Sequence, residues 1–226
     1  MKLLVLSPLF SAIAWIITLC SLLVLWFEDG KPKSKVSSPS ITFISGIGTF
    51  YDWIFITGSV ITALFFVITL LQFLFYKPRH YLLENSTFKQ RFWAHLCALF
   101  LGTASMASLI ALTILNNPQD ESIHWILTLA FSFLVLLCAS FNLIAIAGGR
   151  HGGTPFYVSF ALKILFIVLS TAILVTMISL IYSCPTIPNQ ALTPSCDKTR
   201  SISAILEWIL GILFFVFVLS WTIDLW

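Results

Sequence analysis

Ionisable side chains inside otherwise apolar stretches are the residues of this sequence that could do chemistry. Glu207 lies within a long apolar stretch near the C-terminus, and His124 and Asp52 each open another such stretch. An ionisable side chain in a membrane-spanning helix costs about 2.5–3.5 kcal/mol on insertion scales, so it is by default a candidate for function. We predict that Asp52, His124 and Glu207 form one polar cluster at the outer side of a membrane, where it binds a lipid headgroup or couples helices.

The neighbours of Glu207 support this prediction but also allow a simpler interpretation. Ser203, Glu207 and Gly211 are spaced by four residues, so they share one face of a helix. This polar and small face should turn toward other helices. In the simpler interpretation, Glu207 only hydrogen-bonds a neighbouring helix and His124 lies among the lipid headgroups.

Other kinds of chemistry have no support in the sequence. No side chains form a recognisable nucleophile-and-base pattern, and no histidine or acid pair has metal-ligand spacing. The glycine-rich run 148–153 lacks the strand and the Lys-Ser/Thr pair of a nucleotide site, so we expect a hairpin there. We therefore expect no catalytic residue, no metal and no cofactor. Because no Lys/Arg run is present, we also expect no nucleic-acid partner.

The composition places the chain among membrane proteins. Of the 226 residues, 59% are hydrophobic and 9% are charged, whereas a soluble domain carries about 25% charged residues. Six stretches reach the roughly 20 apolar residues that a spanning helix needs. They are Leu3–Trp26, Trp53–Phe75, Phe92–Leu115, Ile123–Ala147, Ile164–Ser183 and Ile202–Leu225. The predicted fold class is all-α, with one six-helix transmembrane domain over residues 1–226.

Several details of these stretches lead to further expectations. Tryptophans, among them Trp26 and Trp221, lie near the predicted helix ends, as expected if indole prefers the headgroup zone. The segment Pro155–Lys163 either extends the fifth helix or lies along the membrane interface. Asp224, two residues from the C-terminus, should meet the inner headgroups.

Two connections are expected outside the cytosol. The connection 27–52 begins polar and then becomes apolar, so its second half should pack on the helices. The connection 184–201 contains Cys184 and Cys196, which could form a disulfide on an oxidising side of the membrane; the alternative is two free thiols.

Basic residues favour an orientation with both termini in the cytosol, because Lys and Arg are enriched on that side. With the N-terminus inside, the inner basic residues are Lys2, Lys77, Arg79, Lys89, Arg91, Arg150 and Lys163. The outer ones are Lys31, Lys33, Lys35, Lys198 and Arg200.

Three short elements resemble the DRAM/FRAG/SFK family of six-helix membrane proteins, which includes autophagy modulators and a GPI-lipid remodelling factor. The segment Pro39–Gly48 is similar to a Pro-x-Ile-Ser-x-x-Gly element before the second helix, with Pro39, Ile44, Ser45 and Gly48 as its key positions. His124 opens the fourth helix, as in the family. The segment Ser203–Trp208, which contains Glu207, is similar to the family's Ser-Ala-x-x-Glu-Trp/Tyr. Gly46 departs from the pattern, because many relatives have Asp there.

The resemblance implies lipid-linked regulation in an endomembrane (Golgi, ER, lysosome or vacuole) or in the plasma membrane. We expect a non-enzymatic, lipid-associated regulator or an accessory subunit of a larger membrane assembly. Its partners would be membrane lipids and another integral membrane protein. The alternatives are a factor in GPI-lipid remodelling and a component of a transporter or channel.

Overall fold

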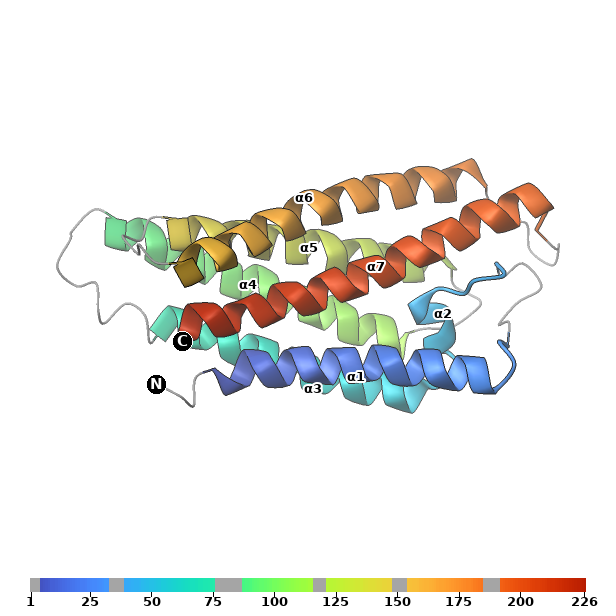
Figure 1. The fold of residues 1–226 in the computed structure, drawn as a ribbon, viewed down its shortest axis with the longest axis horizontal. Helices are drawn as coiled ribbons and strands as arrows, with labels where there is room; N and C mark the ends of the chain where they lie inside the picture. Colours follow the sequence, from blue (N-terminus) through green and yellow to red (C-terminus); the bar gives the residue numbers. More distant parts are fainter. Residues whose placement is uncertain (1–4, 33–38, 76–86, 116–120, 148–153, 185–191) are drawn as a thin grey trace.

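Six long helices and one short helix make up the described part of the chain (Figure 1). The computed structural model describes residues 5–32, 39–75, 87–115, 121–147, 154–184 and 192–226, and no strand occurs among them. The helices are α1 (Leu6–Glu28), α2 (Ile44–Gly48), α3 (Asp52–Phe75), α4 (Thr87–Ile114), α5 (Glu121–Ala147), α6 (Thr154–Ser183) and α7 (Pro194–Leu225). All except α2 are long and apolar enough to cross a membrane, which confirms the predicted all-α fold with six spans.

The six long helices run side by side and form a closed ring of neighbours. Going around the ring, α5 packs on α4, α4 on α3, α3 on α1, α1 on α7 and α7 on α6. The contact between α5 and α6 closes the ring and is the least extensive of the six. The start of α1 and the end of α7 lie at the same end of the bundle, while α2 lies near the other end (Figure 1).

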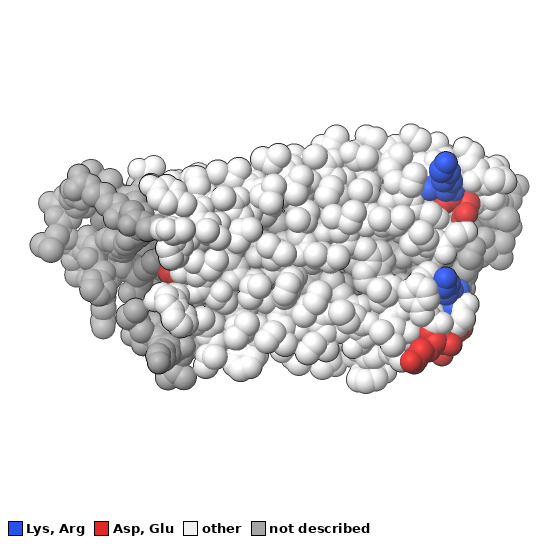
Figure 2. Space-filling view, viewed as in Figure 1, with Lys and Arg blue, Asp and Glu red and all other residues white. Residues whose placement is uncertain are grey.

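The surface of the bundle has the charge distribution of a membrane protein. On the face shown in Figure 2, most charged side chains lie at the end that carries the start of α7 and the end of α1; a small acidic patch lies at the opposite end, and the long middle is uncharged. We name this the outer end, in keeping with the predicted orientation. A wide uncharged belt matches the hydrocarbon core of a bilayer, which is about 30 Å thick.

Several helices begin earlier than predicted, and α6 and α7 differ most; α4 begins at Thr87 rather than at Phe92. Helix α6 begins at Thr154 rather than at Ile164, so Pro155–Lys163 extends the helix. Helix α7 begins at Pro194 rather than at Ile202. A proline is tolerated in the first turn of a helix, where its missing N–H would have no partner. Thr193 then caps α7, because its side chain accepts a hydrogen bond from the backbone N–H of Cys196 at 3.3 Å.

Aromatic side chains fill the centre of the bundle. Trp221 was expected near the headgroups, but it is fully buried and its ring lies 4.8 Å from that of Phe66 and 4.9 Å from that of Phe217. Its indole N–H donates to Asn142 Oδ1 at 3.2 Å. A tryptophan can lie this deep because its one polar group has a partner inside the bundle. Trp26 lies near the end of α1, where it was expected; it is 4% exposed and donates to the carbonyl of Pro32 in the following connection.

Candidate functional site

The segment before α3, residues 39–51, folds over the outer end of the bundle and is attached to α7. The backbone N–H and the hydroxyl of Ser40 both donate to the Asp197 carboxylate, at 2.7 and 2.6 Å. Further in, the indole N–H of Trp208 donates to the carbonyl of Thr42 at 3.2 Å. These bonds hold the segment in place immediately before α2 begins.

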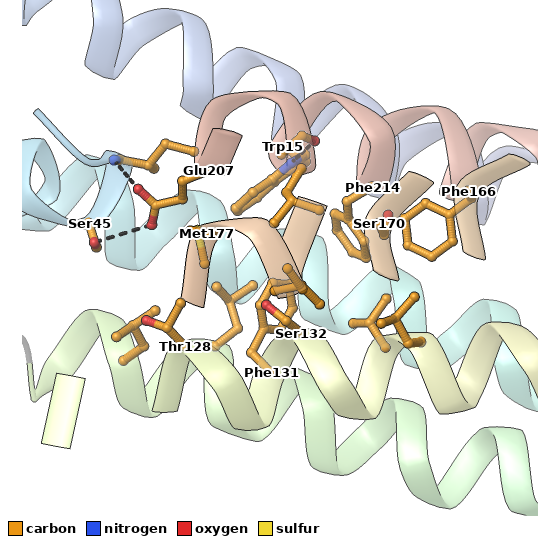
Figure 3. Close-up of a pocket in the computed structure, with 18 of the residues that line it drawn as sticks. Trp15, Ser45, Thr128, Phe131, Ser132, Phe166, Ser170, Met177, Glu207 and Phe214 are labelled. Carbon is orange, nitrogen blue, oxygen red and sulfur yellow. Dashed lines mark hydrogen bonds between the residues drawn. The ribbon is translucent and has the colours of Figure 1, made fainter. Parts of the chain in front are cut away.

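Glu207 of α7 caps α2. A five-residue helix leaves its first N–H groups without partners, and Phe43, at the cap position, supplies no side-chain bond. The N–H of Ile44 instead donates to Glu207 Oε2 at 2.7 Å, and the Ser45 hydroxyl donates to Oε1 at 3.4 Å (Figure 3). A carboxylate at a helix N-terminus is also favoured by the helix dipole. A side chain from a distant helix therefore replaces the local cap that the sequence of α2 lacks.

His124 joins the same site through Ser45. Its Nε2 lies 2.9 Å from Ser45 Oγ. If Nε2 carries the proton, His124 donates to Ser45 and Ser45 donates to Glu207, which satisfies all three groups in one chain. Ser45 is 1% exposed, so this chain connects α5, α2 and α7 in the interior of the protein. We name Ser45, His124 and Glu207 the polar joint.

Asp52 does not belong to the polar joint. It is the exposed first residue of α3, and its Oδ1 accepts the backbone N–H of Trp53 at 2.7 Å. Next to it, Tyr51 donates its hydroxyl to Asp29 and to the carbonyl of Leu25, which ties the start of α3 to the end of α1. The hydrogen bond to Asp29 raises the pKa of Tyr51 to about 12, because losing the proton would break it and place two negative charges together.

Ser45 and His124 have the spacing of a nucleophile and its base, but the surroundings fit a structural chain better. In a catalytic triad the acid orients the base, whereas Glu207 contacts Ser45 and the backbone of α2. The N–H of Ile44, which could stabilise an oxyanion, is already bound to Glu207. The arrangement is therefore suited to coupling helices.

A narrow cavity of about 70 Å³ begins directly beneath the polar joint (Figure 3). Ile44, Ser45 and Glu207 line its outer end, and Phe166 and Phe214 line its inner end. The remaining lining residues come from all six long helices and are mostly apolar: Trp15, Phe55, Leu109, Leu112, Thr128, Phe131, Ser132, Val135, Leu136, Ser170, Leu174, Met177, Leu210 and Gly211. A cavity of this kind, apolar with a few polar groups, is the usual form of a binding site for an apolar ligand.

The residues singled out in the Pro39–Gly48 element have physical reasons for their identities. Pro39, Ile44, Ser45 and Gly48 are all buried. A Cβ at Gly48 would lie 2.3 Å from Cδ1 of Phe55, so only glycine lets the end of α2 rest on α3.

Cys184 and Cys196 are joined by a disulfide, which links the end of α6 to the start of α7. Arg200 is buried beside this link and donates from Nε to the carbonyl of Cys184 at 3.0 Å. The disulfide therefore joins α6 and α7 at the outer end of the bundle.

A second polar site, which sequence reasoning missed, lies toward the other end of the bundle. Lys163 is fully buried and its Nζ lies 2.6 Å from Asp224 Oδ2. Ser159 donates to Asp224 Oδ1 at 2.7 Å and accepts from Lys163 at 2.5 Å. The expectation that Asp224 meets the headgroups is wrong, because its side chain is 4% exposed and faces Lys163. The four-residue spacing of Ser159 and Lys163 was the available signal, since it places both on one helix face.

Six long apolar helices around a buried polar joint and an apolar cavity define a multi-pass helical membrane protein. The chain belongs to the Frag1/DRAM/Sfk1/Cwh43P family, because the family model described as its N-terminal domain matches residues 4–226. A relative is Protein sfk1 of Schizosaccharomyces pombe (strain 972 / ATCC 24843), 28% identical over 139 residues. That alignment covers 62% of this chain and 42% of the relative, so less than half of the relative's length is matched. No solved structure matches the chain.

Proposed function

We propose that the protein is a lipid-associated membrane regulator in which α2 responds to a lipid held beneath it. The observation that carries the proposal is the cavity, whose outer end is lined by the same Ile44, Ser45 and Glu207 that hold α2 in place. A molecule in the cavity touches these residues directly. If the molecule binds more tightly when α2 is in this position than when α2 is displaced, its presence stabilises this position of α2.

The position of α2 gives this response a route to a partner. The segment that ends in α2 is bonded to α7 through Asp197 and Trp208, and its other end leads into α3. A shift of α2 would therefore move residues on the outer end of the bundle. This supports the role of regulator or accessory subunit of a larger membrane assembly, with another integral membrane protein as the partner.

GPI-lipid remodelling is the second candidate, and one observation favours it. The 2.9 Å between Ser45 Oγ and His124 Nε2 would suit a serine nucleophile with its base acting on a lipid ester. An enzyme of this kind would change the lipids of vesicles that contain only the purified protein. A regulator would leave them chemically unchanged.

The proposal is tested by hydrogen exchange of residues 39–51 in nanodiscs of synthetic phosphatidylcholine, compared with lipid-free detergent. In the wild type, lipid should slow exchange at the amide of Ile44. Glu207→Leu removes the cap of α2, and losing a cap costs about 0.5–2 kcal/mol, so exchange should become roughly 2- to 30-fold faster. The variant should also lose the response to lipid.

Asp52→Asn is the matched control, because it neutralises an exposed acid at the same end of the bundle. It should exchange and respond like the wild type. If Glu207→Leu responds to lipid as the wild type does, the acid is only tolerated and the response of α2 does not depend on it. If lipid leaves exchange of residues 39–51 unchanged in the wild type, α2 is not the responding element.

A further inference from the structure

We propose that the cavity takes a single acyl chain of a bilayer lipid, which enters from the membrane between α5 and α6. This inference rests on the proposed function, since it names the ligand of the same site. The ligand is then a hydrocarbon chain within the bundle, whereas the sequence pattern predicts only a site for a lipid headgroup at the outer end of the bundle.

The length of the cavity suits an acyl chain. Phe166 and Met177, at its two ends on α6, are 11 residues apart, which is about 16 Å along a helix. This is close to half of the roughly 30 Å hydrocarbon core, so the cavity is about as deep as one leaflet.

The two ends of the cavity have different chemistry. At the inner end, Phe166 stacks on Phe217 with ring centroids 4.5 Å apart, and Phe214 lies beside them on α7. Aromatic rings there suit the methyl end of a chain. At the outer end, Ser45 and Glu207 lie where the more polar part of a lipid would be. The cavity therefore has the same polarity gradient as the leaflet around it.

The contact between the facing sides of α5 and α6 is where an acyl chain could enter the cavity most easily. It is the least extensive contact in the ring of six helices, and α6 is the least buried of the six spans. The cavity lies directly behind it, because Thr128, Phe131 and Ser132 of α5 and Leu174 and Met177 of α6 line its walls. Separating two helices here breaks fewer contacts than at any other place in the ring.

Ser170 places a small side chain in the middle of the cavity. Its side chain lines the cavity, it is 1% exposed, and its hydroxyl has no hydrogen-bond partner among the described residues (Figure 3). The small side chain keeps the middle of the cavity open, so a larger residue at position 170 should block it.

The experiment uses the full chain in nanodiscs that contain a phosphatidylcholine with a diazirine near the middle of one acyl chain. After irradiation, we expect label on the buried Leu174 and Met177 as well as on the lipid-facing Val175. Ser170→Leu should lower the label on Leu174 and Met177 at least fivefold and leave Val175 unchanged. Ser179→Leu, the same change on the exposed face of α6, should change neither.

Ser132→Leu fills the cavity from α5 and serves as the second variant if Ser170→Leu does not fold. Two results would overturn the inference. One is label on Val175 alone, and the other is label on Leu174 and Met177 that neither cavity-filling variant lowers. The two proposals fail separately. Glu207→Leu leaves the middle of the cavity intact, so a labelled cavity without an α2 response disproves only the regulatory role. An unlabelled cavity disproves the acyl chain as ligand.

Discussion

At the scale of single residues, the charged side chains inside the bundle are satisfied in two different ways. Glu207 accepts hydrogen bonds from the first residues of α2, so the N–H of Ile44 and the hydroxyl of Ser45 compensate its charge. Lys163 and Asp224 compensate each other and share Ser159. Both solutions obey the rule that an ionisable group within a membrane protein is paired or hydrogen-bonded.

Removing one partner of the inner pair should be much worse than removing both. Asp224→Leu leaves the buried Lys163 ammonium uncompensated, which should destabilise the protein by about 3–5 kcal/mol. Lys163→Met combined with Asp224→Leu removes both charges and should recover most of the loss. Thermal unfolding in detergent measures both variants. An unchanged midpoint for Asp224→Leu alone would show that the pair contributes little.

At the scale of elements, close helix contacts depend on a few small residues. Lipid is as apolar as the helices, so packing and hydrogen bonds hold a membrane bundle together. Gly58 of α3 illustrates this. A Cβ at that position would lie 1.8 Å from Oγ1 of Thr18 on α1, which is far inside contact distance.

Gly58→Ala should therefore push α1 and α3 apart. Overpacking of this kind costs about 1–3 kcal/mol, so the midpoint of thermal unfolding should fall. Thr18→Ala should rescue part of the loss, because it removes the hydroxyl but leaves the Thr18 Cβ at 2.8 Å. Two destabilising effects that simply add would indicate that the two residues are not in contact.

At the scale of the whole molecule, the features bearing on function are divided between the two ends. The polar joint, α2 and the disulfide lie at the outer end, and the Lys163–Asp224 pair lies toward the end that holds both termini. The disulfide favours an extracytoplasmic outer end, because such bonds persist in oxidising compartments. This agrees with the orientation inferred from the basic residues.

Glycan mapping tests that orientation. A glycosylation site introduced between Lys33 and Ser38 should be modified in a glycosylating cell, because that connection is predicted to face the lumen or exterior. The natural Asn85-Ser86-Thr87 site is predicted to face the cytosol and should stay unmodified; Asn85 and Ser86 lie outside the described residues. The mass of the expressed protein before and after enzymatic deglycosylation shows whether each site carries a glycan. A glycan on Asn85 would reverse the orientation.

The sequence by itself determined the class of protein and the number of spans. Charge is so scarce that six apolar stretches stand out against short polar connections, and hydrophobicity over about 20 residues is a local property. Glu207 could be recognised for the same reason, since an acid among apolar residues is visible without knowledge of its partners. Helix starts were less visible, because α6 begins at Thr154 and α7 at Pro194, which lie outside the most apolar part of each stretch.

Only the tertiary structure decided which polar groups meet. Ile44 and Glu207 are 163 positions apart, and Lys163 and Asp224 are 61 apart. Nothing local predicts that α2 forms, because its five residues carry no cap of their own and the cap comes from α7. Partner choice for a buried charge depends on how helices rotate and shift against each other. That depends on contacts such as Gly58 against Thr18, which exist only once the bundle has assembled.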